Sequence, residues 1–183
     1  MSSLYDEEMV AAIGLAGHAR SGKSTLAAML SRRVGARVVA FGDIVRQAAR
    51  DQHLDPSDRA TLMDVGQRWA ETNPASLCSA VLRGTDAETR PLVIDGIRHV
   101  AIVEELRRQL NSGSLWLVFL AVPSWVLTER LEGEMDPRTH RSESEMSALE
   151  LHADLVLDAT ASSAELCDAV VASIHTRPVR GRT

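Results

Sequence analysis

The sequence predicts a single α/β domain in which helices cover both faces of a five-stranded parallel sheet. Short apolar runs alternate with segments whose apolar residues recur at helical spacing, and a glycine-rich stretch joins the first run to the first helix. This alternation is typical of parallel sheets, because each crossover helix packs back onto the sheet. The length of 183 residues and the hydrophobic content of 45% suit one domain. We expect a core over residues 9–175, with flexible ends at 1–8 and 176–183.

Composition argues against several classes of protein. The net charge of -5 disfavours a nucleic-acid surface, which needs a basic excess. The longest apolar run, residues 115–122, is too short to cross a bilayer, so we expect no membrane partner. Residues 1–8 are acidic and do not resemble a secretory leader. Cys78 and Cys167 are spaced unlike zinc or redox pairs, which predicts buried, reduced thiols and a cytoplasmic location.

The glycine-rich stretch matches the phosphate-binding pattern G-x-x-x-x-G-K-[ST]. Its residues are Gly17, His18, Ala19, Arg20, Ser21, Gly22, Lys23, Ser24 and Thr25. The glycines let the backbone turn tightly and aim its N–H groups at an anion, at the positive end of the next helix. We expect Lys23 on the β- and γ-phosphates of ATP and the Ser24 hydroxyl on Mg²⁺. An apolar strand over residues 10–16 and a helix over 26–34 flank the pattern, which argues against a chance glycine-rich turn.

A second apolar run, residues 37–41, predicts a strand that leads into a helix beginning near Ile44. Asp43 lies between the two. Its carboxylate suits the N-cap of the helix, where it would accept hydrogen bonds from free backbone N–H groups. A chemical role for Asp43 is equally open.

The third predicted strand, residues 91–95, ends in Asp95. Parallel sheets form their sites at the carboxyl ends of strands, and a phosphate-binding loop needs a partner aspartate for Mg²⁺ or its waters. Asp95 is therefore the best candidate for that partner. The alternative is a cap for the helix expected over residues 100–110.

Residues 56–84 predict two helices, the first capped by Ser57 and the second carrying Pro74 in its first turn. The fourth strand covers residues 115–122 and should be buried on both faces. A short helix is expected over residues 124–131.

Residues 132–141 then predict an irregular, mobile loop that would close over the site as a short lid, because Gly133 and Pro137 oppose regular structure. Arg138 and Arg141 lie in this loop and Arg130 just before it. A solvated charged loop is the alternative.

Ser142 and Glu145 form a predicted capping box for the next helix. A last strand over residues 153–157 and a helix ending at Ile174 complete the chain.

The order of these motifs resembles the nucleoside monophosphate kinases, of which adenylate kinase is a familiar member. The phosphate-binding loop is followed by F-G-D-I-V-R at residues 41–46, V-I-D-G-I-R at residues 93–98 and an arginine-bearing lid. The likeness covers residues 10–174. It implies a three-layer P-loop fold with strand order 2-3-1-4-5. In adenylate kinase the third strand ends in D-G-F-P-R, whereas here Arg98 directly follows Ile97.

The resemblance also implies roles for single residues. Arg46 and Arg98 match the arginines that hold the phosphate of the acceptor. Arg130 matches an arginine near the transferred phosphoryl group, and the lid residues Arg138 and Arg141 would gather there. Residues 51–82 carry no motif of a named substrate.

We therefore expect an ATP-dependent phosphotransferase that moves the γ-phosphoryl group to a nucleoside monophosphate or a similar phosphorylated metabolite. A second possibility is an alcohol kinase resembling dephospho-CoA kinase or shikimate kinase, with Asp43 as the general base. An NTP-hydrolysing switch and a nucleotide-binding regulatory module are further alternatives. The oligomeric state stays open.

Overall fold

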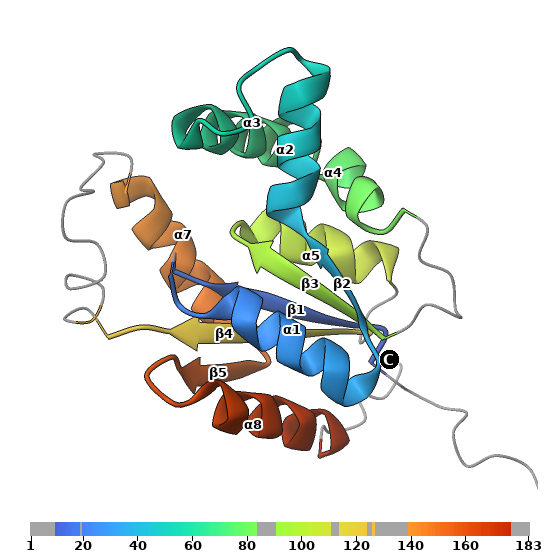
Figure 1. Cartoon of the computed structure of the whole chain (residues 1–183), viewed down its shortest axis with the longest axis vertical. Coiled ribbons are helices and arrows are strands. Elements are labelled where there is room, and N and C mark those ends of the chain that lie inside the picture. The colour runs from blue at the N-terminus through green and yellow to red at the C-terminus, as the bar shows by residue number, and fades with distance from the viewer. Residues whose placement is uncertain are drawn as a thin grey trace, which may run out of the picture.

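The structure, a computed structural model, describes most of the chain (Figure 1). The described residues are 10–18, 20–83, 91–110, 114–123, 126 and 139–176, and the side chains of 139–144 are not described.

A five-stranded sheet lies at the centre of the fold (Figure 1). Its strands are β1 (Ala12–Gly17), β2 (Arg37–Ala40), β3 (Leu92–Ile97), β4 (Leu115–Ala121) and β5 (Leu155–Asp158). The order is β2-β3-β1-β4-β5 and every pairing is parallel, which confirms the predicted sheet. The strand that leads into the phosphate-binding loop is therefore the central one, and its carboxyl end lies between those of β3 and β4.

Helices cover both faces of this sheet, which makes three layers. They are α1 (Lys23–Val34), α2 (Phe41–Asp51), α3 (Arg59–Thr72), α4 (Pro74–Val81), α5 (Val100–Gln109), α7 (Thr139–His152) and α8 (Ser163–His175). Side chains alternate along β1, so Ile13 and Leu15 pack with α1 and α8, whereas Ala12 and Ala16 face the layer that contains α5 and α7. Each face thus has its own apolar cluster.

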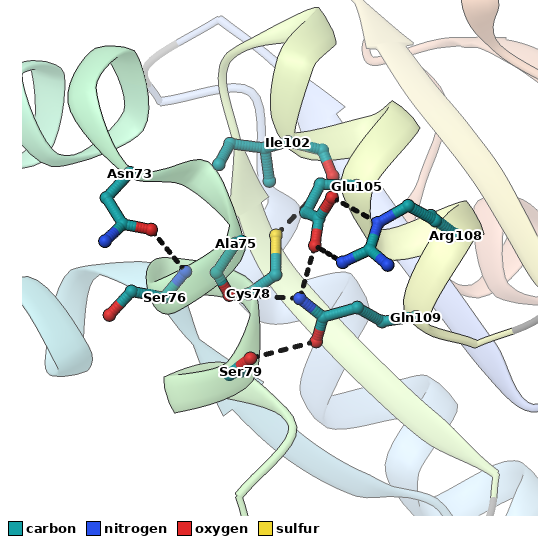
Figure 2. Close-up of polar contacts among 9 residues, drawn as sticks. All are labelled: Asn73, Ala75, Ser76, Cys78, Ser79, Ile102, Glu105, Arg108 and Gln109. Atoms are coloured by element: carbon teal, nitrogen blue, oxygen red, sulfur yellow. Dashed lines mark hydrogen bonds and ion pairs between the residues drawn. The ribbon is translucent and has the colours of Figure 1, made fainter.

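Helices α2, α3 and α4 follow β2, the edge strand of the sheet, and α4 packs against α5 (Figure 1). Figure 2 shows the polar contacts between α4 and α5. Gln109 of α5 donates from Nε2 to the backbone oxygen of Ala75, at 3.0 Å, and Ser79 donates to Gln109 Oε1, at 3.2 Å. Burial raises the pKa of the Cys78 thiol at this interface to about 12. These contacts fix α4 on α5, and Asn73 joins α4 directly to α3.

Three predicted helix starts are wrong. Helix α2 begins at Phe41 with Ala40 as its N-cap, so Asp43 lies in the first turn and is not the cap. Strand β2 runs into α2 without a loop, which leaves no separate capping position. The N-cap of α3 is Asp58, whose carboxylate accepts from the backbone N–H groups of Ala60 and Thr61, while Ser57 donates to Asp55.

Helix α7 begins at Thr139, so Ser142 lies inside the helix and is not an N-cap. The predicted irregular loop is therefore wrong for residues 139–141, because nothing after Pro137 breaks the helix. Residues 132–138 lie outside the described part of the chain. Of the helix expected over residues 124–131, the structure describes Val126 alone, and Val126 is helical.

Two other expectations are confirmed: Pro74 occupies the first turn of α4, and Cys78 and Cys167 are free and buried.

Among the described helices, none is long and apolar enough to cross a membrane.

Candidate active site

The phosphate-binding loop joins the end of β1 to the start of α1. Gly17 ends the strand with φ at +133°, and a Cβ there would lie 2.6 Å from the backbone oxygen of Leu120 in β4. Only glycine tolerates both conditions. Gly22 is the N-cap of α1, with φ at +88°. The positive φ thus favours glycine at both positions, and at Gly17 the close approach to β4 requires it as well.

The N-terminus of α1 is open to an anion. Its N-cap has no side chain that accepts from the first backbone N–H groups, and its first turn has no acidic residue. Unsatisfied N–H groups and the helix dipole therefore give this end a positive potential. Residues 20–25 line a hollow of about 280 Å³ there. This geometry suits the phosphates of a nucleotide.

Lys23 is 9% exposed and lies against the loop. Its Nζ donates to the backbone oxygen of Gly17 at 2.9 Å, to the backbone oxygen of His18, and to Ser21 Oγ at 3.1 Å. Burial, and to a lesser extent the nearby positive charge of Arg98, lowers the pKa of Lys23 to about 8, while Asp95 acts in the opposite direction. A phosphate beside Nζ would favour the charged form of the lysine.

Asp95 lies beside the loop, as predicted for the partner of Mg²⁺. Ser24 Oγ donates to Asp95 Oδ2 at 2.6 Å, and Asp95 is 8% exposed. The cap of α5 is His99, which removes the alternative role of Asp95 as a helix cap. A hydroxyl and a carboxylate are oxygen ligands that Mg²⁺ accepts, so these two residues fit the cation.

A bulge in β3 accounts for the position of Asp95. Leu15 of β1 pairs with Asp95, but Ala16 pairs with Ile97, so Gly96 is the extra residue. Gly96 has φ at +90°, a conformation that residues with a Cβ rarely adopt. Bulges re-aim side chains near sites, and this one lies directly after the carboxylate that reaches Ser24.

Arg98 follows β3 at the same edge of the sheet. Its side chain keeps exposed surface, yet desolvation by the surrounding protein lowers the pKa of its guanidinium. The positive charge of Arg59 in α3 lowers this pKa further, and Asp95 raises it. No signal in the sequence indicates this effect of Arg59, because no local pattern links an arginine at a helix start to a residue that follows a distant strand.

Arg46 and Asp43 pair with each other on α2. Arg46 Nη2 lies 2.6 Å from Asp43 Oδ1, and the two side chains are 42% and 70% exposed. The pairing of Ala40 with Asp95 brings the start of α2 to the carboxyl end of β3. The pair therefore lies on the helix that begins beside Asp95, while a shared pocket for Arg46 and Arg98 stays a prediction.

The remaining predicted site residues are described in part or not at all. Ala19, Arg130 and Arg138 lie outside the described residues, and Arg141 lies in α7 with its side chain outside the description.

Helix α7 is bonded to α5 by contacts that the sequence did not indicate. His99 Nδ1 lies 2.8 Å from Glu145 Oε2, and Arg107 Nη2 lies 3.2 Å from Asp154 Oδ2 just beyond the end of α7. Asp154 also accepts from the backbone N–H of Leu117. Helix α7 is thus fixed to the loop that carries Arg98.

Comparison with known families gives one match over most of the chain. The family model described as an AAA domain matches residues 13–151. This range includes the phosphate-binding loop, Asp95 and Arg98.

The chain is similar to archaeal relatives that carry only a family label. It is 32% identical over 121 residues to a UPF0200 protein of Methanosarcina barkeri, an alignment that covers 66% of this chain and 64% of the relative. It is 29% identical over 150 residues to a UPF0200 protein of Methanosarcina mazei, covering 76% and 78% of the two chains. The chain thus spans less than two thirds of the M. barkeri relative.

Solved structures share the fold at low sequence identity. The shikimate kinase of Aquifex aeolicus has a TM-score of 0.60 at 18% identity, covering 93% of this chain and 99% of that one. A sugar kinase of Janibacter sp. has a TM-score of 0.63 at 16% identity, covering 96% and 100%. A gluconokinase of Sinorhizobium meliloti has a TM-score of 0.54 at 19% identity, covering 92% and 94%. The architecture is therefore that of a P-loop kinase.

Proposed function

Because this chain belongs to the AAA domain family and has a P-loop kinase fold, we propose that it is an ATP-dependent phosphotransferase. Its acceptor would be a nucleoside monophosphate or a similar small phosphorylated molecule. The observation that carries this proposal is the bond from Ser24 to Asp95, beside an uncapped helix N-terminus. These groups supply phosphate binding and a divalent-cation site at one edge of the sheet.

The proposed mechanism relies on alignment and positive charge. Phosphoryl transfer passes through a loose transition state, so the protein contributes mainly by positioning groups and stabilising charge. The backbone N–H groups at the start of α1 and Lys23 would hold the phosphates of ATP. Ser24 and Asp95 would hold Mg²⁺, which when bound neutralises charge on the phosphate oxygens.

Arginines would complete the site. A guanidinium binds phosphate oxygens through two parallel hydrogen bonds and stays charged at any working pH. We assign Arg98 and Arg46 to the acceptor. Arg130, Arg138 and Arg141 are the candidates for stabilising the transferred group.

An alcohol kinase is the second candidate function. Structures named shikimate kinase, sugar kinase and gluconokinase share the fold, and Asp43 lies in the first turn of α2, just after β2, with most of its side chain exposed. In that case Asp43 would accept the proton of the acceptor hydroxyl. A phosphate acceptor is already a nucleophile and needs no base.

The substrates of this reaction favour a cytoplasmic location. ATP is a metabolite of the cytoplasm, and a reducing compartment preserves free thiols such as Cys78 and Cys167. We include this location in the proposal.

A screen of acceptors tests the proposal. ADP release would be measured with Mg²⁺, ATP and a panel of nucleoside monophosphates and phosphorylated or hydroxylated metabolites. We expect release to rise only with particular acceptors, and Lys23→Met to abolish the rise. Hydrolysis at one rate with every acceptor and with none would contradict a kinase and support an NTPase.

Asp43→Asn separates the two classes of acceptor. Activity toward a phosphate acceptor should change little in this variant. Activity toward an alcohol acceptor should be lost.

A further inference from the structure

Two pairs of polar side chains hold α7 against α5, at opposite ends of the sheet. Arg107, in the last turn of α5, donates from Nη2 to Asp154 Oδ2 at 3.2 Å, and Asp154 directly precedes β5 at the amino ends of the strands. His99, two residues after the carboxyl end of β3, lies with Nδ1 2.8 Å from Glu145 Oε2. The second of these pairs therefore lies at the edge of the sheet that carries the phosphate-binding loop.

The imidazole of His99 serves this contact and not the cap of α5. His99 is the N-cap residue of α5, but its side chain makes no capping hydrogen bond. The cap uses the backbone oxygen of His99, which accepts from the N–H groups of Ile102 at 3.1 Å and Val103 at 3.3 Å. The side chains of His99 and Glu145 are 17% and 40% exposed, so water screens their interaction only in part. Removing the imidazole should therefore break the bond to α7 and leave α5 capped.

Glu145 lies at the boundary between two parts of α7. After it, Met146 and Leu149 are buried in the apolar cluster that also contains residues of α5. Before it, the first turn of α7 contains Arg141, and Figure 1 shows this helix beginning on the side of the molecule toward which the strands run. The bond from His99 thus joins α7 between its buried part and its first turn.

We propose that His99 is a positioning residue, which fixes the first turns of α7 relative to the loop that carries Arg98. The proposal rests on the function argued above, which assigns Arg98 to the acceptor and Arg141 to the transferred group. Arg98 directly precedes His99 in the chain, so one bond connects the segments that carry these two arginines. A misplacement of about 1 Å can cost a reaction about a hundredfold in rate, so such a connection has a direct use in alignment.

Hydrogen exchange along α7 tests the positioning without turnover. Amide exchange of the full chain would be followed by mass spectrometry for the native protein and for His99→Ala. We expect faster exchange, by about threefold to tenfold, at residues 143–148, whose helical hydrogen bonds close the first turns of α7. Exchange at residues 149–152 should change by less than about twofold, because the apolar core holds that part of the helix.

Two further variants separate the loss of this bond from general damage to the fold. His99→Asn keeps an N–H group at the same distance along the side chain as Nδ1, so it should restore most of the protection. Glu145→Ala should accelerate the same amides as His99→Ala. The double variant should add nothing further, because both changes break one bond. Additive effects would show that the two residues act separately, which would contradict the proposal.

Arg107→Ala is the matched control, because it breaks the polar contact at the other end of α7. This variant should accelerate exchange near His152, whose backbone oxygen also accepts from Arg107. It should leave the amides of residues 143–148 within about twofold of their native rates, since distant sites act independently.

The kinetics of acceptor-dependent ADP release provide the functional measurement. His99→Ala should lower kcat about tenfold, while KM for ATP stays within about twofold because the phosphate-binding loop is unchanged. His99→Asn should recover most of this loss, and Arg107→Ala should keep the native kcat.

Two further results would overturn the proposal. One is unchanged exchange in His99→Ala, and the other is faster exchange in a His99→Ala variant whose kcat is native. The kinase proposal fails in a different way. If no acceptor stimulates ADP release by the native protein while His99→Ala still accelerates exchange, the anchoring of α7 stands and the kinase proposal is contradicted.

Discussion

Under the proposed function, Asp95 is the residue on which metal-dependent chemistry would depend most. It is almost fully buried, and it accepts the hydroxyl of Ser24 at 2.6 Å. Asp95→Asn keeps an oxygen that accepts this bond but removes the charge. We expect Mg²⁺-dependent turnover to fall by roughly ten- to a hundredfold.

The Mg²⁺ dependence of nucleotide binding provides the check on this prediction. Affinity of the Asp95→Asn variant for ATP in the presence of a chelator should match that of the native protein. Equal losses of affinity with and without Mg²⁺ would indicate that Asp95 has only a structural role.

In the protein without bound nucleotide, burial of Lys23 makes the free energy of unfolding depend on pH. Its pKa is about 8 in the folded protein against 10.5 for an ordinary lysine, mainly because of burial. The unfolded chain therefore binds more protons between these values, and this group makes stability rise with pH across that window. Below about pH 8 the charged lysine costs the folded state up to about 3 kcal/mol.

Lys23→Met should remove this contribution. Denaturant unfolding at pH 7 and at pH 10 would measure it. The gain in stability from the substitution should be larger at pH 7 than at pH 10. The account would be contradicted if the free energies of unfolding of the variant and the native protein differed by the same amount at both pH values.

At the scale of elements, the bulge in β3 connects backbone geometry to the site. Gly96 has φ at +90°, so Gly96→Ala should destabilise the fold by about 1–2 kcal/mol. It should also weaken Mg²⁺-dependent ADP binding, because the bulge positions Asp95.

Gly35→Ala is the control for Gly96→Ala. Gly35 also has a positive φ, at +67°, but it caps the far end of α1. This variant should lose similar stability and keep its ADP affinity. Native ADP affinity in Gly96→Ala would show that the bulge does not position the carboxylate.

The elements also show what the sequence could predict. All five strands were predicted because strands buried in a parallel sheet need continuous apolar residues, and the flanking strand and helix identified the phosphate-binding loop. Helix starts were predicted less well. Ser57 and Asp58 are adjacent and both are good caps, and local sequence does not decide between them.

Apart from the meeting of Asp95 with the phosphate-binding loop, contacts between distant elements could not be predicted from local sequence patterns. The bond between His99 and Glu145 depends on how α7 packs. The bulge at Gly96 likewise appears only when β1 and β3 are paired. The motif residues of the site were therefore predictable, and their partners were not.

At the scale of the whole molecule, the strand order explains why the site forms where it does. With β1 between β3 and β4, the phosphate-binding loop, Asp95 and Arg98 reach one edge of the sheet. The residues that the proposed function assigns to the phosphates of ATP and to Mg²⁺ therefore meet at the carboxyl ends of neighbouring strands.

The fate of the γ-phosphoryl group tests the central claim most directly. The protein would be incubated with γ-labelled ATP, Mg²⁺ and the acceptor that best stimulates ADP release, and the products would be separated. The account predicts that the label appears on the acceptor in step with ADP, and that Lys23→Met transfers none. Label recovered only as inorganic phosphate, at the same rate with and without the acceptor, would contradict it.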